Sequence, residues 1–304
     1  MIVAMRPVLL LGLAWVASAQ SSLDLSVLAS RAQSFAESLP NSVCTEVLRQ
    51  REVRYESRLR IRPNDPLLVA PPPKLIEREI VSDLGYALER TPALQWREVR
   101  KVLRVGDKQI TTKEKARERL LFGLRSERDR ERHRLLSEFQ KYGLDVTVTD
   151  YGLSLLMFLP SEVRKFNFEF EKREFVGADA MQVFLFQRRD TDVSVTVFNE
   201  KQMTHARLEG RIWIRERDGT PLRIQLLTRT KSEEDVILDD GTVEYEPSRF
   251  GPLMVTGVRL VRFVNAKPIA EAVYQYSNHQ RFNAEAELKF DTVPDDPKPE
   301  EKKP

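Results

Sequence analysis

The most regular feature of the sequence is an alternation of apolar and polar residues that begins near Glu162 and continues to Phe290. A period of two is the spacing of a strand that presents one face to a core and the other face to water. Turn-forming residues at 217–221, 239–242 and 265–268 separate the runs. Because no long helical pattern intervenes, we predict about eight antiparallel strands in this half of the chain. The clearest runs carry Phe166, Phe168 and Phe170; Val193, Val195 and Val197; Ile212 and Ile214; and Leu222, Ile224 and Leu226.

The first part of the chain contains both helical and strand periods. Residues 23–39 have apolar side chains at steps of three and four, which predicts a helix that ends at Pro40. Residues 44–60 carry apolar side chains at odd positions, which predicts a long strand whose inward face Arg49 and Arg51 interrupt. Further strands are predicted at 74–86 and 94–105, after a proline-rich loop.

Residues 111–143 form a predicted helical insert. Thr111 and Glu114 have the spacing of a capping box, and Gly143 is placed to end the second helix. Between positions 113 and 134 there are nine basic and five acidic side chains. This charge pattern is typical of exposed helical faces with ion pairs, and it also suits a surface that meets anionic lipid headgroups or an acidic partner.

The N-terminal residues 1–19 have the pattern of a cleavable signal peptide. Arg6 precedes an apolar stretch, and Ala17-Ser18-Ala19 is a small-residue cleavage site. The stretch is shorter than the roughly 20 residues that span a bilayer. We therefore expect a soluble periplasmic or secreted protein, with one domain over residues 20–293. The tail 294–304 contains only prolines and charged residues, which predicts disorder.

Composition narrows the class of function. The net charge of +3 is too small to indicate nucleic acid as a partner. The single cysteine, Cys44, excludes an internal disulfide. We interpret Cys44 as a small buried residue, with an intermolecular disulfide or a reactive thiol as the alternative.

The search for catalytic chemistry finds no G-x-S-x-G, H-E-x-x-H, C-x-x-C or glycine-rich phosphate loop. His133, His205 and His279 lack the spacing of metal ligands, and Asp190 and Asp192 are typical of a turn. The sequence therefore predicts no catalytic residue, no metal and no cofactor. An enzyme with an unrecognised site stays an alternative.

Aromatic and aliphatic residues give the better candidate site. Aromatic side chains dominate ordinary cores, and they also line apolar cavities inside strongly curved sheets. On the second interpretation, the candidate ligand-binding residues are Phe166, Phe168, Phe170, Phe184, Trp213 and Leu226.

Two short segments resemble known families. Gly210-Arg211-Ile212-Trp213-Ile214, a turn at Asp218-Gly219 and Pro221-Leu222-Arg223-Ile224 resemble a hairpin of LolA/LppX-like lipoprotein-carrier proteins. Leu39-Pro40-Asn41-Ser42-Val43-Cys44 resembles a motif of a group of uncharacterised exported bacterial proteins. The resemblance implies an α+β fold, in which a large curved antiparallel sheet, or half-barrel, packs on a few helices around an apolar pocket.

Together these features predict an exported periplasmic protein that binds a lipid or another apolar ligand, or a lipid-linked protein, between helices and sheet. An anionic membrane surface is a further expected partner, through residues 113–134. The alternative is a non-catalytic scaffold of the cell envelope with a fully packed core. Alternating strands also occur in integral outer-membrane proteins.

Overall fold

The computed structural model describes the chain in ten ranges: 23–40, 42–55, 72–89, 95–126, 129–189, 195–199, 202–206, 208–231, 235–248 and 251–281. The predicted signal peptide at 1–19 and the predicted tail at 294–304 lie outside these ranges. Most of the proline-rich loop also lies outside them, as do Asp190, Asp192 and Val193.

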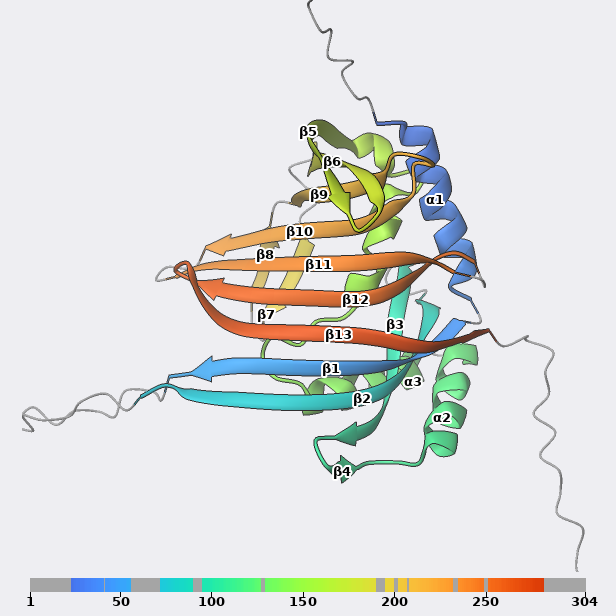
Figure 1. The fold of residues 1–304 in the computed structure, drawn as a ribbon. Coiled ribbons are helices and arrows are strands. Elements are labelled where there is room, and N and C mark those ends of the chain that lie inside the picture. The colour runs from blue at the N-terminus through green and yellow to red at the C-terminus, as the bar shows by residue number, and fades with distance from the viewer. Residues whose placement is uncertain are drawn as a thin grey trace, which may run out of the picture.

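An antiparallel sheet of eleven strands forms the body of the protein (Figure 1). The order across the sheet is β4-β3-β2-β1-β13-β12-β11-β10-β9-β6-β5. Strand β3 at one side, and β5 and β6 at the other, run across the direction of the long central strands, so the sheet curls and stays open (Figure 1). The strands are β1 (Ser42–Arg54), β2 (Lys74–Glu89), β3 (Gln95–Val105), β4 (Lys108–Gln109), β5 (Phe166–Val176), β6 (Asp179–Arg188), β9 (Glu209–Arg215), β10 (Pro221–Lys231), β11 (Val236–Ser248), β12 (Gly251–Val264) and β13 (Lys267–Arg281).

Most strands pair with their neighbours in the chain, and the last strand pairs with the first in the interior of the open sheet. Strands β9 to β13 are neighbours in chain order, and so are β1 to β4. The last strand, β13, pairs with β1 in a register that places Tyr276 opposite Glu46. Two further strands, β7 (Val195–Asn199) and β8 (Gln202–Ala206), form a separate ribbon. The predicted fold class, a large curved antiparallel sheet on a few helices, is confirmed.

Helix α1 (Leu25–Ser38) lies across the concave face of the sheet. Asp24 caps it by accepting a hydrogen bond from the backbone N–H of Ser26 at 2.9 Å. The apolar stripe that predicted this helix is the buried face, because Leu28, Ala32 and Phe35 belong to the main core.

The predicted helical insert folds as α2 (Lys113–Arg125) and α3 (Asp129–Tyr142), which pack on β2 and β3. The N-cap of α2 is Thr112, whose hydroxyl accepts from the backbone N–H of Lys115. The N-cap therefore lies one residue after the predicted Thr111, and the predicted capping box is wrong because Lys115 occupies the third position of the helix. Leu120 and Leu135 form a second, smaller core with the outer face of the sheet.

The predicted phase of the first strand is wrong. In β1 the even positions Cys44, Glu46 and Leu48 are buried, whereas Arg49 and Arg51 are exposed. The odd-numbered valines favoured the opposite phase in the sequence. The core selects the even face because Leu48 packs there in the main cluster, and the polar side chains of Glu46, Gln50 and Glu52 are buried on the same face as a consequence.

The hairpin turn predicted at 239–242 is also wrong, because β11 runs straight through it. Gly241 pairs with Leu260 of β12 in regular register. A Cβ atom at Gly241 would collide with the ring of Tyr151, so this glycine serves close packing and not a turn. The turn predicted at 265–268 is confirmed at Asn265 and Ala266, which both have positive φ.

Candidate functional site

The concave face of the sheet is covered by the chain itself. Residues 144–159, which we call the cover segment, cross this face and include the 3-10 helix η1 (Tyr151–Phe158). The main core contains four side chains of this segment, Val146, Leu153, Leu155 and Phe158. They pack there with residues of α1 and of the long strands. The segment therefore occupies the place where the sequence predicted an apolar pocket.

Four of the six predicted pocket residues gather beside the end of the cover segment. The ring of Phe158 lies 5.3 Å from that of Phe166 and 5.6 Å from that of Phe168. Phe170 contacts Phe184 across the β5–β6 pair, with ring centroids 5.7 Å apart. These edge-on contacts are typical of a packed aromatic core. The fifth residue, Leu226, also lies in the main core.

Trp213 lies on the opposite face of the sheet. It forms a small cluster with Met181 and Val183, and its indole N–H donates to a carboxylate oxygen of Glu174. The neighbouring positions on β9, Ile212 and Ile214, point into the main core. Strand alternation thus separates Trp213 from the other predicted pocket residues.

A small cavity opens at one end of the concave side. It has a volume of about 40 Å³ and is lined in part by Phe35, Leu39 and Leu253. Small-molecule pockets measure roughly 300–1,000 Å³. This cavity is therefore too small for a ligand as large as an acyl chain.

A larger cavity, of about 650 Å³, lies on the outer face beside β1 and β2. Its walls carry paired charges: Arg49 bonds to Glu79 at 3.0 Å, and Arg51 bonds to Glu77 at 3.0 Å. Charged, paired walls suit water better than an apolar ligand.

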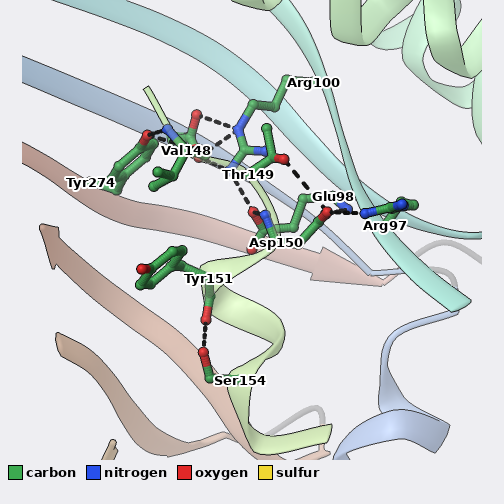
Figure 2. A network of polar contacts seen from close by, with 10 residues as sticks. Arg97, Glu98, Arg100, Val148, Thr149, Asp150, Tyr151, Ser154 and Tyr274 are labelled. Carbon is green, nitrogen blue, oxygen red and sulfur yellow. Dashed lines mark hydrogen bonds and ion pairs between the residues drawn. The ribbon is translucent and has the colours of Figure 1, made fainter. Parts of the chain in front are cut away.

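Polar side chains of the sheet hold the backbone of the cover segment. The hydroxyl of Tyr274 donates to the carbonyl of Val148 at 2.8 Å and accepts from its N–H at 3.0 Å (Figure 2). The hydroxyl of Tyr245 accepts from the N–H of Leu155 at 3.1 Å and donates to the carbonyl of Gly152 at 3.2 Å. These bonds satisfy backbone groups that the irregular segment cannot pair within itself.

Further along β1, the amide of Gln50 makes two hydrogen bonds to the start of the cover segment. Its oxygen accepts from the N–H of Leu144 at 3.0 Å, and its nitrogen donates to the hydroxyl of Thr147 at 2.7 Å. The first turn of the segment is thereby fixed to the middle of the sheet.

A buried charge cluster lies beside these bonds. The guanidinium of Arg100 contacts both oxygens of Glu46 at 2.9 Å and one oxygen of Glu98 at 2.7 Å, and all three side chains are at most 2% exposed. The guanidinium also stacks over Phe139 of α3, 4.9 Å from the ring centroid, and it lies near the ring of Tyr274. We call these three residues, Glu46, Glu98 and Arg100, the buried triad.

The triad carries two carboxylates for one guanidinium. Burial raises the pKa of Glu98 above its ordinary value, and Asp150 and Glu46 act in the same direction against Arg100. Burial lowers the pKa of Arg100, but Glu46 and Glu98 outweigh it and raise that pKa well above its ordinary value. One oxygen of Glu98 has no hydrogen-bond partner in the described part of the chain.

Strand β3 is hydrogen-bonded to the cover segment at Asp150. The N–H of Asp150 donates to Glu98 at 2.7 Å, the N–H of Glu98 donates back to the Asp150 carboxylate at 2.8 Å, and Arg97 contacts that carboxylate at 2.7 Å (Figure 2). Asp150 has φ of 67°, a left-handed conformation that a non-glycine residue adopts at some cost. The bonds from Glu98 and Arg97 hold the backbone in this conformation.

The histidines and the cysteine, which were the remaining candidates for a metal or catalytic site, do not form a common site in the described ranges. His133 is exposed, with its Nε2 2.7 Å from a Glu89 oxygen, and His279 is on β13, where burial lowers its pKa. The side chain of His205 lies outside the described part. Within the described ranges, no three metal-ligating side chains come together. Cys44 is buried, as predicted, and burial raises the pKa of its thiol.

The buried triad was not predicted from the sequence. A signal was present, since Glu98 and Arg100 alternate on one face of β3 and Glu46 lies between the buried Cys44 and Leu48. Their meeting depends on the β1–β2–β3 pairing, which places Leu84 between Cys44 and Arg100 across the sheet. That register is not readable from one strand alone.

Fold and site define an open antiparallel half-barrel whose concave face is covered by its own chain. The sequence matches no family model and no curated protein. Among solved structures it is similar to a DUF1329 family protein from Desulfovibrio piger, with 11% identity and a TM-score of 0.33, over 86% of this chain and 94% of that chain. A TM-score this low adds nothing to the fold described above, and the resemblance to carrier proteins stays a prediction.

Proposed function

We propose that this chain is an exported binding protein of the cell envelope that takes an apolar ligand, such as a lipid acyl chain, on the concave face of its sheet. The ligand would replace part of the cover segment and contact the aromatic residues around Phe166. The observation that carries the proposal is the cover segment itself, an irregular stretch that lies over an apolar sheet face.

The attachment of the cover segment supports exchange with a ligand. Its backbone is held by side chains of the sheet, such as Tyr274 and Tyr245, and not by strand pairing. Each hydrogen bond contributes only about 0.5–1.5 kcal/mol net, because water replaces it when the segment lifts. The exposed apolar sheet would in turn be covered by the ligand, which offsets the cost of opening.

The test uses the chain from residue 20 onward, purified without detergent, with native mass spectrometry before and after incubation with envelope lipids. Organic extraction identifies any lipid that is retained. The variant Tyr274→Phe removes both hydrogen bonds to Val148, which weakens the covered state by about 1–3 kcal/mol. We expect lipid occupancy at sub-saturating concentration to rise about tenfold.

Tyr276→Phe is the matched control. Tyr276 is buried on the same strand and face, but its hydroxyl makes no hydrogen bond among the described residues. Lipid uptake by this variant should equal that of the parent. Thermal unfolding confirms that each variant is folded. A clean protein mass for parent and Tyr274→Phe, unchanged by lipid, would contradict the proposal.

A second candidate function is a non-catalytic envelope scaffold, and the packed concave core favours it. Phe158, Phe166 and Phe186 leave little space in that core. On this alternative the outer surfaces carry the function, and no lipid is retained by parent or variants. The same mass measurement therefore separates the two functions.

A further inference from the structure

Several exposed cations of the α2–α3 hairpin make no ion pair within the part of the chain that the structure describes. We infer that the outward face of the α2–α3 hairpin docks on an anionic phospholipid surface. The exposed cations that define this face, which we call the basic face, are Lys113, Lys115, Arg119, Arg130, Arg134 and Lys141. The exposed carboxylates on the same two helices are Glu114 and Glu118, and the half-buried Glu131 pairs with Arg134 at 3.6 Å.

The outer face of the sheet shows the contrasting arrangement. There, exposed arginines bond to carboxylates across strands, as in Arg51–Glu77 at 3.0 Å and Arg259–Glu271 at 2.8 Å. On the basic face, Lys115, Arg119 and Arg130 make no ion pair with any residue in the described ranges. Cations without internal partners are available to lipid phosphates.

An apolar side chain stands among these cations. Phe122 is 64% exposed and lies one helical turn from Arg119. Both residues border a cavity of about 250 Å³ between α2, α3 and β3. Arg134 and Leu135 line it too, as do Lys101 and the carboxylates Glu131 and Glu138. An aromatic ring flanked by basic side chains matches the boundary between lipid headgroups and acyl chains, where the ring enters and the cations meet phosphate.

The basic face is held in a fixed orientation. On the inward side of α2, Arg117 bonds to the buried Asp83 at 3.0 Å, and Leu124 packs closely on Gly85 of β2. On α3, Glu138 contacts the buried Lys101. The outward residues are therefore presented together, which a surface contact with a flat bilayer requires. An acidic protein would need the charges but gives no reason for Phe122.

The experiment is sedimentation of the chain from residue 20 onward with two kinds of vesicle, phosphatidylglycerol mixed with phosphatidylcholine and phosphatidylcholine alone. We expect binding to the anionic vesicles only, weakened by high salt. Arg119→Gln should weaken binding about fivefold, the usual effect of one basic residue near an anionic surface. Phe122→Ser should weaken it about tenfold, through lost burial of the ring.

Two control variants match these changes in chemistry. Arg51→Gln removes an exposed but paired cation from the sheet, and Phe175→Ser removes a ring that is 79% exposed on β5. Neither should alter vesicle binding. The proposal is overturned if anionic vesicles do not bind, if Arg51→Gln has the effect of Arg119→Gln, or if Phe122→Ser has none. Capture of an acidic protein without vesicle binding would also overturn it.

Discussion

Arg100 lies between two carboxylates, and all three groups are removed from water. The effect on stability of removing a charge from such a cluster depends on which charge is lost. Arg100→Met leaves two buried carboxylates without their cationic partner, which costs about 3–5 kcal/mol. Glu98→Gln leaves one guanidinium with one carboxylate, and the new amide oxygen can still accept from Arg100 and Asp150. We expect Glu98→Gln to change the free energy of unfolding in urea by less than about 1 kcal/mol at neutral pH.

The free energies of unfolding of the parent and of Glu98→Gln should diverge as the pH rises. Since the folded pKa of Glu98 is raised above its ordinary value of 4.5, the folded state holds this proton more tightly than the unfolded chain does. The stability that follows is present below pH 4.5 and is lost as the pH rises through the folded pKa. Glu98→Gln lacks this loss, so its stability relative to the parent should increase with pH across that window. Parallel stability curves would contradict the raised pKa.

At the scale of elements, strands and helices with an unbroken period could be predicted from the sequence. Helix α1 and strands β5, β9 and β10 follow their apolar spacing because the apolar face of each packs in the main core. The errors have a common cause, which is contact with a distant segment. The inward phase of β1 is set by packing in the main core, and Asp-Gly in β11 gave a turn signal although Gly241 accommodates the ring of Tyr151.

The candidate site divides in the same way. Phe166, Phe168 and Phe170 could be predicted to share a face, because they alternate within one strand. That Phe158 and the cover segment lie against them could not be predicted. The apolar run from Leu153 has neither an α-helical nor a strand period, and the hydrogen bonds that attach it to the sheet come from side chains of other elements. The position of the cover segment is determined by contacts that exist only once the sheet has formed.

Gly241 provides a direct test of how the cover segment docks. Gly241→Ala places a methyl group against the ring of Tyr151, so either the ring or the strand must shift. We expect a loss of about 1–3 kcal/mol in the free energy of unfolding, the usual cost of overpacking. Gly257→Ala on the adjacent strand is the control, because the nearest atom to its new methyl group is 3.6 Å away. Equal effects from the two substitutions would show that strand propensity, and not the contact with Tyr151, decides the result.

Across the whole molecule, the two faces of the sheet contribute unequally to stability. Exposed ion pairs on the outer face, such as Arg49–Glu79, contribute about 0–1 kcal/mol each. The concave side buries the main core, which draws on α1, the cover segment and most strands. Burial of this apolar surface is the main stabilising term. The sheet has two halves, strands β1–β4 and strands β5, β6 and β9–β13. The stability of the main core therefore depends on the strands that join these halves.

The join between the halves is the pairing of β13 with β1, formed by residues from the two ends of the described chain. A chain that ends at Asn265 lacks β13, so β1 and β12 become open edges in the middle of the sheet. It also loses Ala272, Tyr274 and Tyr276 from the main core. We expect no cooperative urea transition by tryptophan fluorescence from such a chain, because neither half retains a closed core.

A chain that ends at Arg281 keeps β13 and is the control for this prediction. It should unfold in one transition with the slope of the full chain, since the slope follows the surface exposed on unfolding. If the chain ending at Asn265 also unfolded cooperatively, with a smaller slope, the strands from β5 to β12 would form a unit that folds alone. The β13–β1 pairing would then join two preformed halves, and opening between them would be a second route to the concave face beside movement of the cover segment.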